Sequence, residues 1–162
     1  MESAGMFAMM AIGAASIVTN PGAATSATSN SVAQGARQGG YDLALGLSHH
    51  PTHRTPGLLT RFAEHTGSKT YLSLFSVEST LDYAVMGRNI LTAMRDARRI
   101  HFNLDGMVGN GVNVRTLVEY GRAGIGEGNV TNWELYKVMS IPDAFQKTVF
   151  YLRGVAVDIG SL

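Results

Sequence analysis

The sequence contains no cysteine and has almost no net charge, and both absences narrow the possible functions. Without Cys the chain has no disulfide, no thiolate nucleophile and no zinc site with sulfur ligands. A formal net charge of +1 provides no overall attraction to nucleic acid or to anionic lipid. Any interaction with nucleic acid therefore requires a local basic patch.

Several common catalytic and phosphate-binding motifs are also missing. The sequence has no Gly-x-Ser-x-Gly nucleophile motif, and the segment 67–70 lacks the first glycine and the Gly-Lys step of a P-loop. The glycine-rich segment 121–128 lacks the strand–loop–helix context of a dinucleotide site. His50 and His53 have no carboxylate at the spacing of a helix-borne zinc motif. We therefore expect no metal and no cofactor.

Long hydrophobic runs are absent as well. The apolar stretch 6–18 is shorter than the ~20 residues that cross a bilayer, and it lacks the basic start of a signal peptide. We therefore expect no stable membrane span. Residues 1–40 are rich in Ala, Gly, Ser and Thr, and Glu2 and Arg37 are the charged residues there. We interpret 1–40 as a linker or the remnant of a delivery module, and 41–162 as the folded domain.

From Tyr41 onwards the hydrophobic pattern predicts an α+β domain. Strands are expected at 43–47, 69–75 and 100–104, and a terminal hairpin at 148–152 and 155–159. Helices are expected from Pro56 to Gly67, from Ser79 to Arg98 and over 112–120, while 133–139 fits a helix or a strand equally. Ser79 and Asp82 resemble a capping box. The predicted architecture has N-terminal helices packed on a twisted, mainly antiparallel sheet formed largely by the second half.

The alternation of apolar residues also predicts the core. Its expected members are the large apolar residues on the inward faces of these elements: Leu45, Phe62, Ile90, Met94, Phe102, Leu104, Leu135 and Phe150.

The densest group of titratable residues is His49, His50 and His53 with Arg54. Histidine takes up and releases protons near neutral pH, as phosphodiester cleavage requires, and an adjacent arginine binds phosphate in a bidentate manner. The same residues are also typical of a solvated polar loop without chemistry, and this alternative stays open.

Two further candidates lie among apolar neighbours. His101, between Ile100 and Phe102, is either a general acid or base facing a cleft or a buried structural histidine. Glu134 lies in an apolar run, where loss of solvation would raise its pKa and suit it to proton transfer; a salt bridge or exposure is the alternative. Lys69 and Tyr71 are candidate substrate-binding residues, and for Tyr71 the alternatives are stacking on a base and simple packing.

Several short segments, in this order, resemble C-terminal toxin domains of bacterial polymorphic toxins of the contact-dependent inhibition and Rhs type. The segments are Gly46-Leu47, Phe62-Ala63, Tyr71, Ile100 to Gly106 (Ile-His-Phe-Asn-Leu-Asp-Gly), Thr131 to Leu135 (Thr-Asn-Trp-Glu-Leu) and Lys147 to Tyr151 (Lys-Thr-Val-Phe-Tyr). The resemblance extends over residues 41–159. Each segment alone is weakly specific, and the ordered set carries the resemblance.

The resemblance implies a metal-independent ribonuclease of the superfamily that includes barnase-like, EndoU-like and RelE-like toxins. In such an enzyme the RNA 2′-hydroxyl attacks the phosphorus. One of His49, His50, His101 and Glu134 would take its proton and another would protonate the leaving oxygen. Arg54 or Lys69 would stabilise the pentavalent phosphate.

The resemblance also implies a larger N-terminal delivery protein, a cognate immunity protein and an RNA substrate. The domain would be secreted or delivered from the cell surface and would act in the cytoplasm of a target bacterium. Two other functions are compatible with the sequence: a toxin that transfers ADP-ribose or hydrolyses NAD, and a non-enzymatic protein-binding module.

Overall fold

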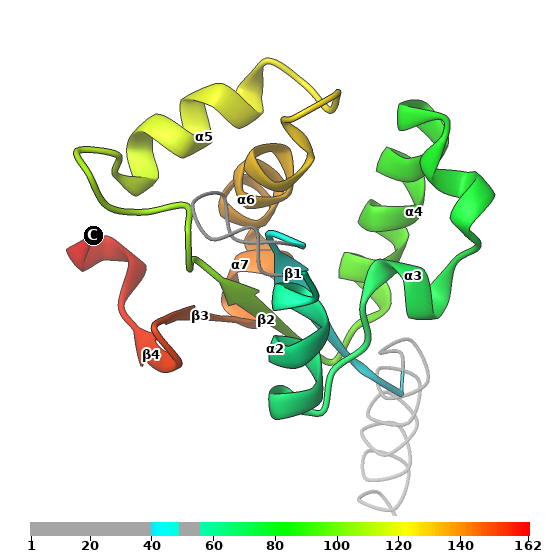
Figure 1. The fold of residues 1–162 in the computed structure, drawn as a ribbon, viewed down its shortest axis with the longest axis horizontal. Helices are drawn as coiled ribbons and strands as arrows, with labels where there is room; N and C mark the ends of the chain where they lie inside the picture. The colour runs from blue at the N-terminus through cyan, green and yellow to red at the C-terminus, as the bar shows by residue number, and fades with distance from the viewer. Residues whose placement is uncertain (1–39, 49–55) are drawn as a thin grey trace, which may run out of the picture. The chain divides into compact units, whose positions relative to one another are not determined.

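The computed structural model describes residues 40–48 and 56–162. In these residues four strands form one sheet in the order β1 (Asp42–Gly46), β2 (Arg99–Asn103), β3 (Thr148–Leu152) and β4 (Val155–Val157), as Figure 1 shows. β1 and β3 both run parallel to β2, and β4 runs antiparallel to β3. Helices and a mixed sheet together confirm the α+β class.

The prediction that the sheet would be mainly antiparallel was wrong, because two of its three strand pairs are parallel. Parallel neighbours need a crossover connection, which usually contains helix. α2 (Leu58–Thr66), α3 (Tyr71–Leu74), η1 (Val77–Thr80) and α4 (Tyr83–Asp96) connect β1 to β2. α5 (Val114–Arg122), α6 (Val130–Ser140) and α7 (Pro142–Gln146) connect β2 to β3. The predicted C-terminal hairpin is the antiparallel pair, and a 3-10 turn η2 (Ile159–Ser161) follows it.

The segment 69–75 is not the predicted strand, because Tyr71–Leu74 within it form the short helix α3. The backbone N–H of Thr70 donates to the Oγ of Ser73 at 2.9 Å, and that hydroxyl donates to the Thr70 carbonyl oxygen at 2.8 Å. Such local bonds compete with the pairing of a strand. Lys69 alone keeps an extended pairing, as a single parallel bridge to Leu43 of β1.

The long helix α4 begins at Tyr83, later than predicted, and Asp82 is its N-cap. The Asp82 carboxylate accepts the backbone N–H of Ala84 at 2.8 Å and that of Val85 at 3.3 Å. Ser79 belongs instead to η1, and Leu81, between η1 and α4, is 83% exposed. The helix therefore starts where a side chain satisfies its first free N–H groups.

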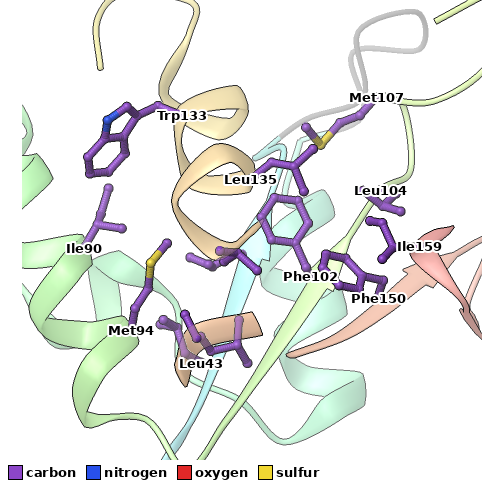
Figure 2. Close-up of a cluster of buried hydrophobic side chains, with 14 of the residues drawn as sticks. Leu43, Ile90, Met94, Phe102, Leu104, Met107, Trp133, Leu135, Phe150 and Ile159 are labelled. Atoms are coloured by element: carbon purple, nitrogen blue, oxygen red, sulfur yellow. The ribbon is translucent and has the colours of Figure 1, made fainter. Parts of the chain in front are cut away.

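Both faces of the sheet are covered. Leu43 and Leu45 point into the main core, which includes Ile90 of α4 and Leu135 of α6. Figure 2 shows Leu43, Ile90 and Leu135 in this cluster. Ala44 points to the opposite face, where Phe62 and other residues of α2 cover it. This alternation is the two-residue period of a strand with both faces buried. All eight predicted core residues are buried: Leu45, Phe62, Ile90, Met94, Phe102, Leu104, Leu135 and Phe150.

α5 and α6 pack very closely, and Gly121 permits this. A Cβ atom at Gly121 would lie 2.0 Å from the backbone oxygen of Asn132, so any larger residue would force the two helices apart. This contact matters for the site described below, because α6 carries Glu134. No helix in residues 40–48 and 56–162 is long and apolar enough to cross a membrane.

Candidate functional site

A pocket of about 310 Å³ lies at the carboxyl end of β1, beside α6. Its wall combines apolar side chains with hydroxyl groups and one carboxyl group. The lining residues are Gly46, Ser48, Leu59, Thr60, Thr70, Tyr71, Leu72, Thr80, Met86, Val130, Thr131 and Glu134. Ligands of sheets with parallel strands bind preferentially at the carboxyl ends of those strands.

The helix α6 presents Glu134 and Thr131 to this pocket. The two residues are three positions apart, and such residues share one face of a helix. Trp133 and Leu135, on either side of Glu134, pack in the main core. Glu134 is itself only 6% exposed, so the core holds the carboxyl-bearing turn of α6 in one position.

Burial raises the pKa of Glu134 from its ordinary value of 4.5 to about 8, since the charged form loses its hydration. The backbone N–H of Gly46 donates a hydrogen bond to this carboxylate, which opposes the rise in pKa but does not cancel it. Glu134 is therefore mainly neutral at pH 7. A neutral carboxylic acid in a pocket can donate a proton to a bound substrate.

Gly46 is suited to this contact by its backbone. Its φ is 139°, and a Cβ atom there would lie 2.8 Å from the backbone oxygen of Asn103 on the neighbouring strand. Glycine therefore lets the end of β1 approach β2 closely while its N–H reaches Glu134.

Tyr71, predicted as a substrate-binding residue, lines the same pocket as Glu134. Its hydroxyl lies 2.7 Å from the Oγ of Ser79 and accepts a hydrogen bond from Asn89 at 3.0 Å. Its ring packs against Phe75, with 5.0 Å between the centroids. These contacts fix the orientation of Tyr71, so it supplies a rigid aromatic wall to the pocket.

Lys69, the other predicted substrate-binding residue, is exposed and is not part of the pocket wall. Its backbone joins the edge of β1, with its N–H donating to the Asp42 carbonyl oxygen at 2.7 Å and its carbonyl oxygen accepting from Ala44 at 2.8 Å. Among the residues that the structure describes, the pocket wall contains no Lys, Arg or His side chain.

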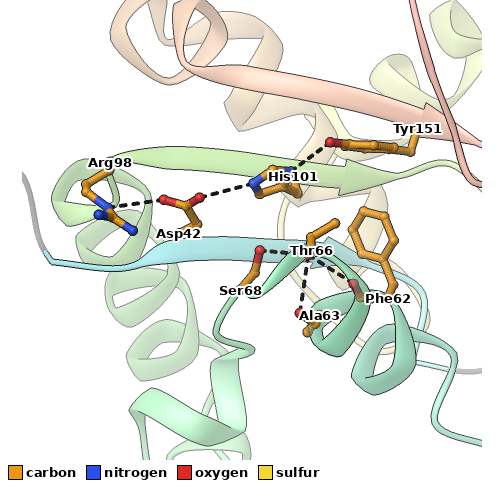
Figure 3. Close-up of polar contacts among 8 residues, drawn as sticks. All are labelled: Asp42, Phe62, Ala63, Thr66, Ser68, Arg98, His101 and Tyr151. Carbon is orange, nitrogen blue, oxygen red and sulfur yellow. Dashed lines mark hydrogen bonds and ion pairs between the residues drawn. The ribbon is translucent and has the colours of Figure 1, made fainter.

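His101 lies in a separate array of polar side chains, shown in Figure 3. Its Nδ1 is 3.0 Å from the Tyr151 hydroxyl and its Nε2 is 3.3 Å from the Asp42 carboxylate. The other oxygen of Asp42 is 3.3 Å from the Nε of Arg98. The His101 side chain is 7% exposed and does not line the Glu134 pocket. This placement suits a histidine that connects β1, β2 and β3.

The remaining predicted site residues, His49, His50 and Arg54, lie outside the described residues, as does His53. His49 follows Ser48 directly in the sequence, and Ser48 lines the pocket. Of the seven predicted site residues, the structure thus brings Glu134 and Tyr71 together and separates Lys69 and His101 from them.

The sequence interpretation missed Thr131, Thr70 and Thr80 as residues of the pocket wall. Thr131 had a usable signal, because Thr-x-x-Glu in a helix places both side chains on one face. Thr70 lies between the predicted residues Lys69 and Tyr71 and offers a hydroxyl group beside them. Thr80 had no such signal, since the segments between β1 and α4 bring it to the pocket only in the folded chain.

The described residues contain no group of three or more His, Asp or Glu side chains placed to hold a metal ion. Compared with models of protein families, with curated proteins and with solved structures, the chain matches none.

Proposed function

We propose that residues 41–162 form an enzymatic toxin domain that cleaves RNA phosphodiester bonds, with the Glu134 pocket as its active site. The observation that carries this proposal is a carboxyl group with a pKa of about 8 in the wall of a pocket at the end of a parallel strand. Strongly perturbed titratable groups in concave sites are concentrated at catalytic centres.

The strand order removes one reason for the choice of a ribonuclease superfamily. That choice belongs with a layout of helices followed by strands, whereas here β1 precedes the helices. The proposal therefore depends on the Glu134 pocket and on the ordered segments that resemble polymorphic toxins.

In the proposed reaction Glu134 acts as the general acid. The 2′-oxygen of the substrate forms a bond to phosphorus while the bond from phosphorus to the 5′-oxygen breaks. A base takes the proton of the 2′-hydroxyl, and Glu134 gives its proton to the departing 5′-oxygen. His49 and His50 are the candidates for the base, and Arg54 for stabilisation of the phosphate. Because the acid must be protonated, the rate should fall as pH rises through about 8.

The delivery of the domain is proposed on the resemblance alone. We expect a larger N-terminal protein to carry it from the producing cell into the cytoplasm of a competing bacterium, and a cognate immunity protein to neutralise it in the producer. Growth rescue by co-expression of a candidate immunity protein tests this part.

One observation favours a second substrate. A described pocket wall without Lys, Arg or His suits an uncharged group better than a phosphate. A neutral Glu134 carboxyl group, which is both donor and acceptor, matches the carboxamide of nicotinamide. In this alternative the pocket binds NAD. The N-glycosidic bond between nicotinamide and ribose breaks, nicotinamide leaves, and the ribose carbon forms a new bond to water or to a nucleophilic group of a target molecule.

Expression of the chain in a bacterium distinguishes these functions. Total RNA on a denaturing gel and cellular NAD are measured before growth stops, for the wild type and for Glu134→Gln. Glu127→Gln is the matched control, since Glu127 is exposed. We expect RNA fragments with the wild type and the control, and none with Glu134→Gln. His49→Ala, His50→Ala and Arg54→Ala then test the loop that follows β1.

Other outcomes are equally informative. Loss of cellular NAD while RNA stays intact would support NAD, and not RNA, as the substrate of the Glu134 pocket. Normal growth with the wild type, or equal toxicity of wild type and Glu134→Gln, contradicts an active site at Glu134 and leaves the protein-binding module. His101→Asn should weaken the fold more than it changes the chemical step, because His101 lies outside the pocket.

A further inference from the structure

A second pocket, of about 570 Å³, lies at the carboxyl ends of β2 and β3. The chain leaving β2 forms most of its wall, from Asp105 to Asn110, and Arg153 of the turn between β3 and β4 forms another part. Leu58, in the first turn of α2, and Leu152 complete the apolar side. The proposed catalytic pocket contains none of these residues.

Two residues of opposite charge, Asp105 and Arg153, line this pocket, and one hydrogen bond joins the backbone of Arg153 to the side chain of Asp105. The backbone N–H of Arg153 donates to Oδ1 of Asp105 at 2.5 Å. Arg153 has a φ of 54°, a left-handed conformation that costs free energy for a side chain of its size and that this bond helps to hold.

The charged ends of both side chains remain available for a ligand. Arg153 is exposed, and within the described residues its guanidinium group makes no hydrogen bond or ion pair. Oδ2 of Asp105 likewise has no partner among those residues. The wall therefore includes one anionic acceptor, Asp105, and one cationic planar donor, Arg153, which no ion pair within the described residues neutralises.

This pair matches a ribonucleotide unit. A carboxylate accepts hydrogen bonds from ribose hydroxyl groups, as acidic residues do in dinucleotide sites. A guanidinium group donates two parallel hydrogen bonds to a phosphate. Free inorganic phosphate would bind this pocket less well than a ribonucleotide unit, because the negative charge of Asp105 would repel it.

The second pocket is next to the first along α2. Leu58 lines the second pocket, whereas Leu59 and Thr60, the next two residues, line the Glu134 pocket. The first turn of α2 thus contributes to the walls of both pockets. A substrate longer than one nucleotide unit can occupy both.

We propose that the pocket between Asp105 and Arg153 is a subsite that binds the ribose and phosphate of a ribonucleotide unit, while another part of the same substrate enters the Glu134 pocket. This inference rests on the proposed function and assigns it a substrate that contains at least two nucleotide units. RNA and NAD both contain such a unit, so the experiment compares them.

Binding of a 5′-fluorescein-labelled RNA of eight nucleotides is measured by fluorescence anisotropy, at several salt concentrations. The protein is the full chain with Glu134→Gln, which is expected not to cleave the probe. Arg153→Asn removes the cation with a residue that accepts the left-handed conformation, and Arg153→Lys restores the charge. Arg99→Gln is the matched control, because Arg99 is also exposed but lies at the opposite end of β2.

We expect Arg153→Asn to weaken RNA binding severalfold and to reduce the slope of log Kd against log salt by about 0.7, the value for one phosphate contact to a single strand. Arg153→Lys should recover most of this slope, and Arg99→Gln should not change it. Asp105→Asn keeps an oxygen for the Arg153 N–H and should reduce the preference for RNA over the same DNA sequence by about fivefold, as for one lost hydrogen bond.

The remaining outcomes distinguish RNA from NAD as the substrate. They also distinguish failure of the subsite from failure of the proposed active site at Glu134. If NAD displaces the labelled RNA and this displacement requires Arg153, the subsite is supported and NAD is identified as its ligand. Equal salt slopes for Arg153→Asn and Arg99→Gln overturn the subsite, even if Glu134→Gln abolishes cleavage. Cleavage of the probe by the Glu134→Gln chain contradicts the proposed function instead, whatever Arg153 does.

Discussion

Replacement of Glu134 by glutamine should stabilise the protein at neutral and alkaline pH while it abolishes activity. Glutamine has the same shape and keeps an oxygen that accepts the Gly46 N–H, but it cannot ionise. The wild-type carboxyl group must either hold its proton against solution or become charged in a buried position. The substitution removes that cost, so loss of activity in this variant would not reflect unfolding.

The size of the effect follows from the difference between the folded and unfolded pKa values. A group with a raised pKa in the folded state binds more protons there than in the unfolded state, so stability falls as pH rises between the two values. For Glu134 these values are about 8 and 4.5. At about 1.36 kcal/mol for each pKa unit, the variant should gain about 5 kcal/mol relative to the wild type above pH 8 and almost nothing below pH 4.5.

Urea unfolding of both proteins at several pH values from 4.5 to 8.5 measures this difference. The other carboxylates titrate equally in both proteins, so the change in free-energy difference with pH belongs to Glu134. Between pH 5.5 and 7.5 it should grow by roughly 1.4 kcal/mol for each pH unit. Glu127→Gln should show no such growth. A constant difference between wild type and Glu134→Gln over this range would refute the raised pKa and with it the neutral acid at pH 7.

Three further predictions concern the framework that holds the site. Gly121→Ala should destabilise the protein by several kcal/mol in thermal unfolding, since its Cβ would clash with the Asn132 backbone. It should also lower activity, because α6 would be displaced. Gly126→Ala is the control, because the space around Gly126 is open. Asp82→Ala should cost about 1 kcal/mol in urea unfolding through loss of the α4 N-cap, and an unchanged midpoint would contradict the cap. Phe102→Ala, at a fully buried position of β2, should cost roughly 3–5 kcal/mol; a cost below about 1 kcal/mol would show that the core is less tightly packed than described.

The positions of most helices and strands could be predicted from short stretches of sequence. Apolar spacing identified β1, β2 and α4, and Gly67 indeed ends α2 with a left-handed residue. The failures were also local in origin. At 69–75 the hydrogen bonds between the Ser73 hydroxyl and the Thr70 backbone outweighed the alternating pattern. At 79–82 the N-cap of α4 is Asp82 and not Ser79.

The direction of the strands was not predicted, although the spacing contained a clue. Long helical segments separate β1 from β2 and β2 from β3, as crossover connections between parallel strands require. The predicted architecture had a mainly antiparallel sheet instead. Strand direction depends on how whole segments pack, so no short stretch determines it.

The candidate site was predicted in part, for the same reason. The sequence by itself determined which residue types are present and which of their neighbours are apolar, and this was sufficient to select Glu134 and the buried core. Only the tertiary structure decided that Glu134 faces a pocket with Tyr71, whereas His101 is bound by Asp42 and Tyr151. The physical reason is that burial and the N–H of Gly46 set the pKa of Glu134, while residues of β1, α2, α3 and α4 line the pocket that it faces. These segments are distant from Glu134 in sequence and meet it only after the chain has folded.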